Sequence, residues 1–173
     1  MTRLLFLTLL LSLNFLPAQS QPPLKQIRMD FFEIGNDSCG ALQLFKSIKN
    51  DDYNSPLIRA YAGASEAASA TCVKGAFKKL EYFSRGKKNL EAAIELDSKN
   101  AEIRFLRFAT QVNAPNFLEY DNINEDKALI LEQLPVLLKQ DSNRDFWVKV
   151  ADFMLLSKKL SKNESADLKE LIK

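Results

Sequence analysis

The chain has 173 residues, a formal net charge of +2 and no histidine, and only two of its residues are cysteines. Histidine is the commonest general base and metal ligand, and two cysteines alone cannot complete a structural zinc site, so neither a catalytic metal nor a cofactor is expected. The near-neutral charge offers no basic block of the kind that binds a row of phosphates, which argues against nucleic acid as a partner.

The first twenty residues have the outline of a cleavable signal peptide. Arg3 is the only charge before a largely apolar run, residues 4–16, and the small residues of Ala18-Gln19-Ser20 follow. A membrane-spanning helix needs roughly 20 apolar residues, so this run is too short to serve as an anchor. We therefore expect cleavage after Ser20, a periplasmic or secreted location, and one mature domain over residues 21–173 without an integral membrane segment.

Apolar side chains recur at spacings of three and four along the expected mature domain, which is the pattern of amphipathic α-helices. The first three helices are expected over about residues 24–34, 38–49 and 56–72. Ser55-Pro56 is a favoured cap and first residue for the third. The many small side chains of this third helix should let a neighbouring backbone come close.

The second half of the chain continues the helical pattern. Residues 76–97 form either one long helix or a hairpin that breaks at Ser84, Arg85 and Gly86. The remaining helices are expected over about 98–112, 124–138 with Pro135 inside, 146–156 and 166–172. Capping boxes are predicted at Ser142 with Asp145 and at Ser161 with Glu164. The sequence thus predicts an all-α domain of about seven or eight helices.

The two cysteines should lie close together if the second and third helices form an antiparallel hairpin. Cys39 stands at the start of one helix and Cys72 at the end of the other. In an oxidising compartment two such cysteines usually form a disulfide. The alternative is a pair of small, buried and unreactive thiols. A catalytic thiol is not favoured, because only Lys74 is at hand to lower its pKa.

One stretch resembles a tetratricopeptide repeat. Residues 90–100 read L-E-A-A-I-E-L-D-S-K-N, which is similar to the close of that repeat's second helix. The resemblance places Ala93 and Gly86 at the small positions of the helix crossing and Phe77 at the aromatic position of the first helix. It implies a stack of antiparallel helical hairpins that binds a protein or peptide. Residues 100–108 and 115–120 also resemble small exported proteins of the Bacteroidota, which implies a periplasmic setting.

Two patterns are candidates for catalytic motifs. Ser84 and Lys87 have the S-x-x-K spacing of serine acyl-transferases, but no companion motif accompanies them, and a solvated helix face or a helix break is the favoured explanation of the pair. Neighbouring carboxylates occur in turns or first helical turns, where the helix dipole explains them: Asp51 and Asp52, Glu125 and Asp126, Glu164 and Asp167. No catalytic residue is therefore predicted.

The candidate binding site is a polar stripe on the helix expected over 98–112. Arg104 and Arg107 are one turn apart, where two guanidiniums can hold a carboxylate or phosphate, and Gln111 continues the stripe. Glu102 and Tyr120 are expected to border the same surface. The alternative is structural: the arginines bind the C-termini of neighbouring helices or Glu side chains within the stack.

The sequence favours an exported, non-enzymatic interaction protein whose partner is a protein or peptide of the cell envelope. One alternative is an enzyme that uses Ser84 with Lys87 or the carboxylates. Another is a carrier that holds an apolar ligand between its helices.

Overall fold

The protein is all-α, as the sequence predicted. The computed structural model describes residues 22–36, 39–49, 53, 55–118, 120–140 and 142–173, and the predicted leader lies outside these ranges. Within the described residues there are eight α-helices and three short 3-10 turns, and no strand. None of these helices combines the length and apolar character that crossing a membrane requires.

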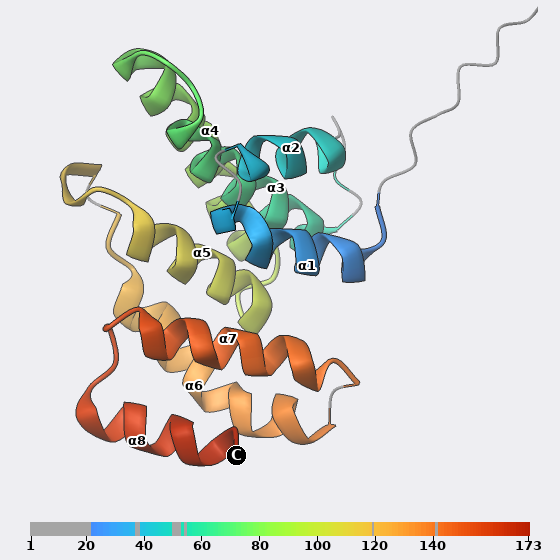
Figure 1. The fold of residues 1–173 in the computed structure, drawn as a ribbon, viewed down its shortest axis with the longest axis vertical. Coiled ribbons are helices and arrows are strands. Elements are labelled where there is room, and N and C mark those ends of the chain that lie inside the picture. The colour runs from blue at the N-terminus through green and yellow to red at the C-terminus, as the bar shows by residue number, and fades with distance from the viewer. Residues whose placement is uncertain (1–21, 37–38, 50–52, 54, 119, 141) are drawn as a thin grey trace, which may run out of the picture.

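Helix α5 lies in the middle of the molecule, with α1 to α4 on one side and α6 to α8 on the other (Figure 1). The helices are α1 (Leu24–Glu33), α2 (Gly40–Ile48), α3 (Pro56–Ala68), α4 (Ala76–Leu96), α5 (Ala101–Asn113), α6 (Ile123–Gln140), α7 (Arg144–Leu156) and α8 (Lys162–Leu171). The 3-10 turns are η1 (Ile34–Asn36), η2 (Ser69–Thr71) and η3 (Asn116–Leu118).

Short polar side chains set several helix starts. The Ser55 hydroxyl accepts a hydrogen bond from the backbone N–H of Ile58 and begins α3, with Pro56 as its first residue. Ser161 and Glu164 form the predicted capping box of α8, which begins at Lys162 and not near residue 166. The capping box predicted at Ser142 with Asp145 was wrong, because Asn143 and not Ser142 precedes α7.

Helix α4 is a single helix of 21 residues and does not break at Ser84 to Gly86. A Cβ on Gly86 would lie 2.4 Å from the backbone N of Ala67 and 2.5 Å from the carbonyl O of Gly63, so glycine is what lets α3 and α4 cross so closely. A tetratricopeptide repeat placed over residues 74–100 would need a turn between two helices. The continuous helix and the 92% exposure of Phe77 do not fit that assignment.

Two apolar cores meet at α5. One joins α1 to α5 and contains, among others, Ile27, Phe45, Ile48, Tyr61, Leu90 and Leu106. The other joins α5 to α8 and contains, among others, Phe105, Phe108, Leu134, Trp147, Met154 and Leu168. Phe31 of α1 contacts both cores, since the centroid of its ring lies 5.5 Å from the ring centroid of Tyr61 and 6.4 Å from that of Phe105. The two halves therefore share one continuous interior.

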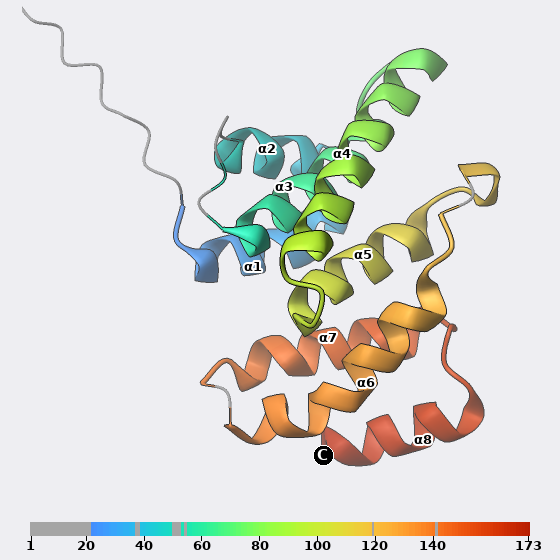
Figure 2. The same cartoon turned by 180° about the vertical axis from the view of Figure 1, so that it is seen from behind.

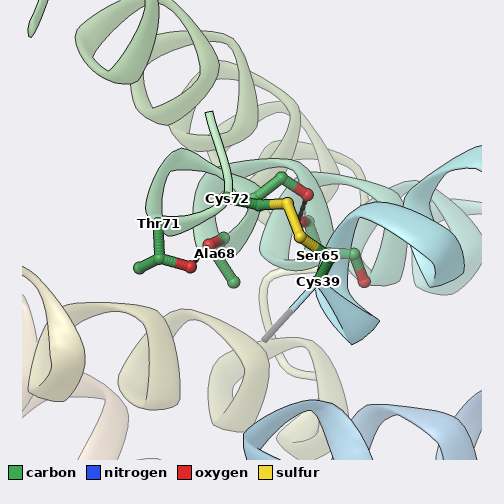
Figure 3. The surroundings of a disulfide bond; sticks show 6 residues. Cys39, Ser65, Ala68, Thr71 and Cys72 are labelled. Carbon is green, nitrogen blue, oxygen red and sulfur yellow. Dashed lines mark hydrogen bonds between the residues drawn. A yellow bond between two sulfur atoms is a disulfide. The ribbon is translucent and has the colours of Figure 1, made fainter. Parts of the chain in front are cut away.

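Cys39 and Cys72 form a disulfide with a Cα–Cα distance of 5.4 Å (Figure 3). Cys39 is the residue before α2, and Cys72 is the residue after η2, which continues α3. The packing of α2 against α3 brings these two ends together, which is the arrangement that the hairpin argument expected. The crosslink fixes the segment that leads into α4.

Candidate functional site

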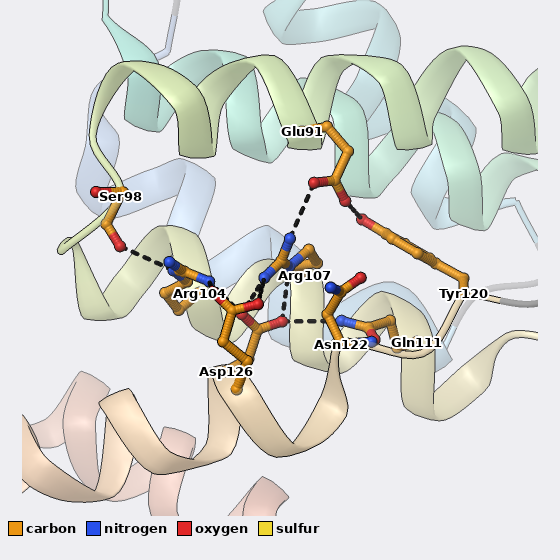
Figure 4. Close-up of polar contacts among 9 residues, drawn as sticks. Glu91, Ser98, Arg104, Arg107, Gln111, Tyr120, Asn122 and Asp126 are labelled. Atoms are coloured by element: carbon orange, nitrogen blue, oxygen red, sulfur yellow. Dashed lines mark hydrogen bonds and ion pairs between the residues drawn. The ribbon is translucent and has the colours of Figure 1, made fainter.

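The polar stripe of α5 is buried between α4 and α6. Arg104, Arg107 and Gln111 are only 7%, 3% and 4% exposed. Asp126, in the first turn of α6, is fully buried and lies at their centre (Figure 4). A buried charge is costly unless it is paired, so the contacts of these residues decide what the stripe does.

Asp126 binds all three side chains of the stripe. Its two carboxylate oxygens accept hydrogen bonds from Nε and Nη2 of Arg107, at 2.8 and 2.7 Å. One oxygen also accepts from Nη1 of Arg104 at 3.0 Å, and the other from Nε2 of Gln111 at 2.8 Å. Asp126 therefore occupies the position between the arginines where the sequence analysis expected the carboxylate of a ligand.

Further contacts extend this group to α4 and to the loop after α5. Nη1 of Arg107 lies 2.9 Å from Glu91 of α4, and the hydroxyl of Tyr120 donates to the same carboxylate at 2.6 Å. Glu125 accepts from Nη1 of Arg104 at 2.6 Å. We call these seven side chains the arginine cluster: Glu91, Arg104, Arg107, Gln111, Tyr120, Glu125 and Asp126.

The protonation behaviour of the cluster follows from burial and pairing. Burial alone would lower the pKa of Arg107, but the hydrogen bonds and charge of Asp126 raise it above its ordinary value. Burial, and then the hydrogen bond to Glu91, raises the pKa of Tyr120. The hydrogen bond from Arg104 lowers the pKa of Glu125. Arg107 therefore stays charged and Tyr120 neutral at physiological pH.

No family model, curated protein or solved structure matches this chain.

Glu102 does not border the same surface, and that expectation is corrected. It accepts hydrogen bonds from Nε and Nη2 of Arg28 at 2.8 and 2.6 Å, and from the hydroxyl of Tyr61 at 2.7 Å. Successive helix residues are about 100° apart, so Glu102 and Arg104 project on opposite sides of α5. The structure thus brings together four of the five predicted binding residues, and Glu102 belongs to the contact of α5 with α1 and α3.

The chain itself supplies carboxylate partners for both arginines of the cluster. Every nitrogen of the Arg107 guanidinium donates to a carboxylate of Glu91, Glu125 or Asp126. Nε of Arg104 donates to the carbonyl of Ser98 at 2.8 Å. An external anion would have to displace Asp126, which is fully buried. These hydrogen bonds and ion pairs therefore hold α4, α5 and α6 together.

Asp126 has a role beyond the one that its sequence position predicts. The sequence predicts that Glu125 and Asp126 stabilise the start of a helix, and both do lie in the first turn of α6. Their contacts with α5 form because the loop between α5 and α6 turns the chain back, so that the first turn of α6 lies against the arginine stripe. The one signal for this pairing in the sequence is that an acidic helix start lies near two arginines.

One open depression lies along α4 beside the cluster. It has a volume of about 410 Å³ and is lined by Ser84, Lys87, Lys88, Glu91, Ala92 and Glu95. Nζ of Lys87 lies 4.5 Å from the ring centroid of Tyr120, which is a cation–π contact. Glu91 belongs to both features, so the arginine cluster holds part of the wall of the depression.

The candidate catalytic groups have different surroundings. Ser84 and Lys87 both line the depression. Asp51 and Asp52 lie outside the described residues. Glu164 accepts a hydrogen bond from the Ser161 N–H in the cap of α8. Among the described residues, no group of three or more potential metal ligands is placed to hold an ion.

Proposed function

We propose that the protein is a non-enzymatic interaction module and that the depression along α4 receives a peptide segment of an envelope protein. The observation that carries the proposal is the lining of the depression. Lys87 and Lys88 stand near Glu91 and Glu95, and the small side chain of Ala92 leaves room between these longer ones. An open site with charges of both signs suits a peptide that carries both.

The rigidity of the depression supports this proposal. Glu91 is held by Arg107 and by the hydroxyl of Tyr120, and Lys87 rests on the Tyr120 ring. A site whose side chains are already ordered loses less conformational entropy when a ligand binds. In this interpretation Arg104, Arg107, Gln111 and Tyr120 support the site and do not touch the partner.

The proposal is tested by filling the depression. Ala92→Arg adds a long side chain on the lining of the depression, in the middle of α4, and arginine is a good helix former. Ala128→Arg on the exposed side of α6 is the matched control. Pull-downs from envelope extract, with thermal unfolding to check the fold, should recover a partner with wild type and Ala128→Arg but not with Ala92→Arg. Identical sets of captured proteins would refute the depression as the docking site.

One observation keeps an enzymatic function as the second candidate. Ser84 and Lys87, the S-x-x-K pair, line the same depression. An esterase and peptidase screen with Ser84→Ala separates the two candidates, because activity that the substitution abolishes would favour the enzyme and activity that survives it clears Ser84. A carrier of an apolar ligand is the third candidate. The depression supports it less well, since this site is open and all its lining residues belong to α4, whereas a carrier would hold its ligand between helices.

A further inference from the structure

The start of α4 projects beyond the rest of the molecule. Both views show its first turns extending away from the other helices (Figures 1 and 2). Every residue from Lys74 to Glu81 is exposed, and the first buried residue of α4 is Phe83. Phe77 is 92% exposed and Leu80 is 50% exposed. We call residues 74–80 the α4 tip.

The charge of the α4 tip is entirely positive. Lys74, Lys78 and Lys79 are its only charged residues, and the first acid along α4 is Glu81. Within the part of the chain that the structure describes, none of these lysines lies within ion-pair distance of a carboxylate. The tip therefore presents a net charge of +3 that is not neutralised locally.

The α4 tip has firm support at its base. Phe83 packs edge-on against Tyr120, with ring centroids 6.2 Å apart, and Gly86 lies in the close crossing with α3. The disulfide of Cys72 fixes the chain just before the tip. Phe77 and Leu80 are three residues apart and share one side of the helix. The tip is thus a supported convex projection with an apolar side and flanking lysines.

We infer that the α4 tip docks on the surface of an anionic lipid bilayer. Phe77 and Leu80 would enter the boundary between headgroups and acyl chains, and the three lysines would contact anionic headgroups. Amphipathic helices with basic flanks and aromatic or leucine side chains bind membrane surfaces in this way. A convex tip that extends past the body can meet a flat surface without interference from other helices. A protein partner would instead have to supply a pocket for Phe77.

The inference is independent of peptide binding in the depression, and vesicle co-sedimentation tests it directly. The mature chain, residues 21–173 without the predicted leader, should sediment with vesicles that contain phosphatidylglycerol at low ionic strength. It should sediment much less with pure phosphatidylcholine vesicles, and binding should fall as salt is added. Lys78→Glu with Lys79→Glu should weaken binding by about tenfold or more, since each basic residue near the surface contributes about fivefold. Phe77→Ala with Leu80→Ala should also weaken it.

Matched controls use residues outside the tip. Lys158→Glu with Lys159→Glu reverses the same charge on an exposed segment elsewhere, and Phe117→Ala removes another exposed aromatic ring. These variants, and Ala92→Arg in the depression, should bind vesicles like wild type. Equal binding by the tip variants and the controls would overturn the inference. Absence of vesicle binding by wild type at low salt would also overturn it, even if the tip variants fail to capture a protein that wild type captures.

Discussion

The carboxylate of Asp126 lies at the centre of the arginine cluster. It is fully buried and accepts hydrogen bonds from Arg104, Arg107 and Gln111. Pairing of this kind contributes little net stability relative to an apolar core, but removing one partner leaves an uncompensated charge in a dry site. The cost of breaking the cluster should therefore be much larger than the cost of losing one exposed ion pair.

We predict that Asp126→Asn lowers the free energy of unfolding by about 3–5 kcal/mol, because both guanidiniums would lose their shared buried anion. Urea unfolding followed by circular dichroism measures this change. Asp121→Asn, at an exposed position just before α6, is the control and should be close to neutral. Equal stability of the two variants would show that the neighbouring glutamates suffice.

At the scale of elements, the crossing of α3 and α4 depends on two glycines. A Cβ on Gly63 would lie 2.7 Å from the carbonyl O of Gly86, and a Cβ on Gly86 would meet the backbone of α3 closer still. The neighbouring atoms are backbone, which cannot move aside as a flexible side chain can. The close packing of this pair positions both the depression and the α4 tip.

We predict that Gly86→Ala destabilises the protein by about 1–3 kcal/mol through overpacking. The net change should be destabilising although alanine is a better helix former than glycine by roughly 1 kcal/mol. Gly35→Ala is the control, because a Cβ there would have no atom within 4 Å. Thermal unfolding of both variants compares them, and a Gly86→Ala variant as stable as wild type would argue against the tight crossing.

The cap of α8 gives a pH-dependent prediction. The hydrogen bond from the backbone of Ser161 and the contact with Lys127 lower the pKa of Glu164 below its ordinary 4.5. A lowered pKa means that this stabilisation is complete above pH 4.5 and is lost as the pH falls through the folded value. Glu164→Ala should therefore cost about 0.5–1 kcal/mol at pH 7, and the difference from wild type should shrink in acid.

The control for this prediction is Glu170→Ala, which removes an exposed carboxylate from the last turn of the same helix. The difference in unfolding free energy between Glu170→Ala and wild type should not shrink as the pH falls. Chemical denaturation at pH 7 and at several values below 4.5 separates the two variants. A Glu164→Ala difference that is constant over this range would refute the role of the ionised carboxylate.

At the scale of the whole molecule, α5 unites the two apolar cores. Phe105 is fully buried and its ring contacts those of Phe31, Phe32, Phe146 and Phe153, at centroid distances between 5.5 and 6.5 Å. These rings come from α1, α5 and α7. The halves on either side of α5 should therefore unfold together.

We predict that Phe105→Ala lowers the free energy of unfolding by about 3–5 kcal/mol. In wild type, the fluorescence of Trp147, the only tryptophan, should change at the same denaturant concentration as the far-UV circular dichroism signal. Phe117→Ala, whose ring is 80% exposed, is the control and should unfold like wild type. Two separated transitions in wild type would contradict a shared interior.

The candidate site could be predicted only in part. The spacing of Arg104, Arg107 and Gln111 placed them on one side of a helix, because that depends on residues close in sequence. Their partner Asp126 belongs to the next helix, and the return path of the loop determines the pairing. Glu102 was misplaced for the same reason, since its partners Arg28 and Tyr61 come from α1 and α3.

The sequence by itself determined the all-α class, the approximate helices and the cap of α8, because the helical pitch and capping act over a few residues. The signal peptide stays a prediction, as its residues lie outside the described chain. Only the tertiary structure decided that α4 is unbroken, that its first turns stand free of the body, and that the arginines face an internal carboxylate. Those features depend on which helices meet, and local spacing carries no information about contacts between distant segments.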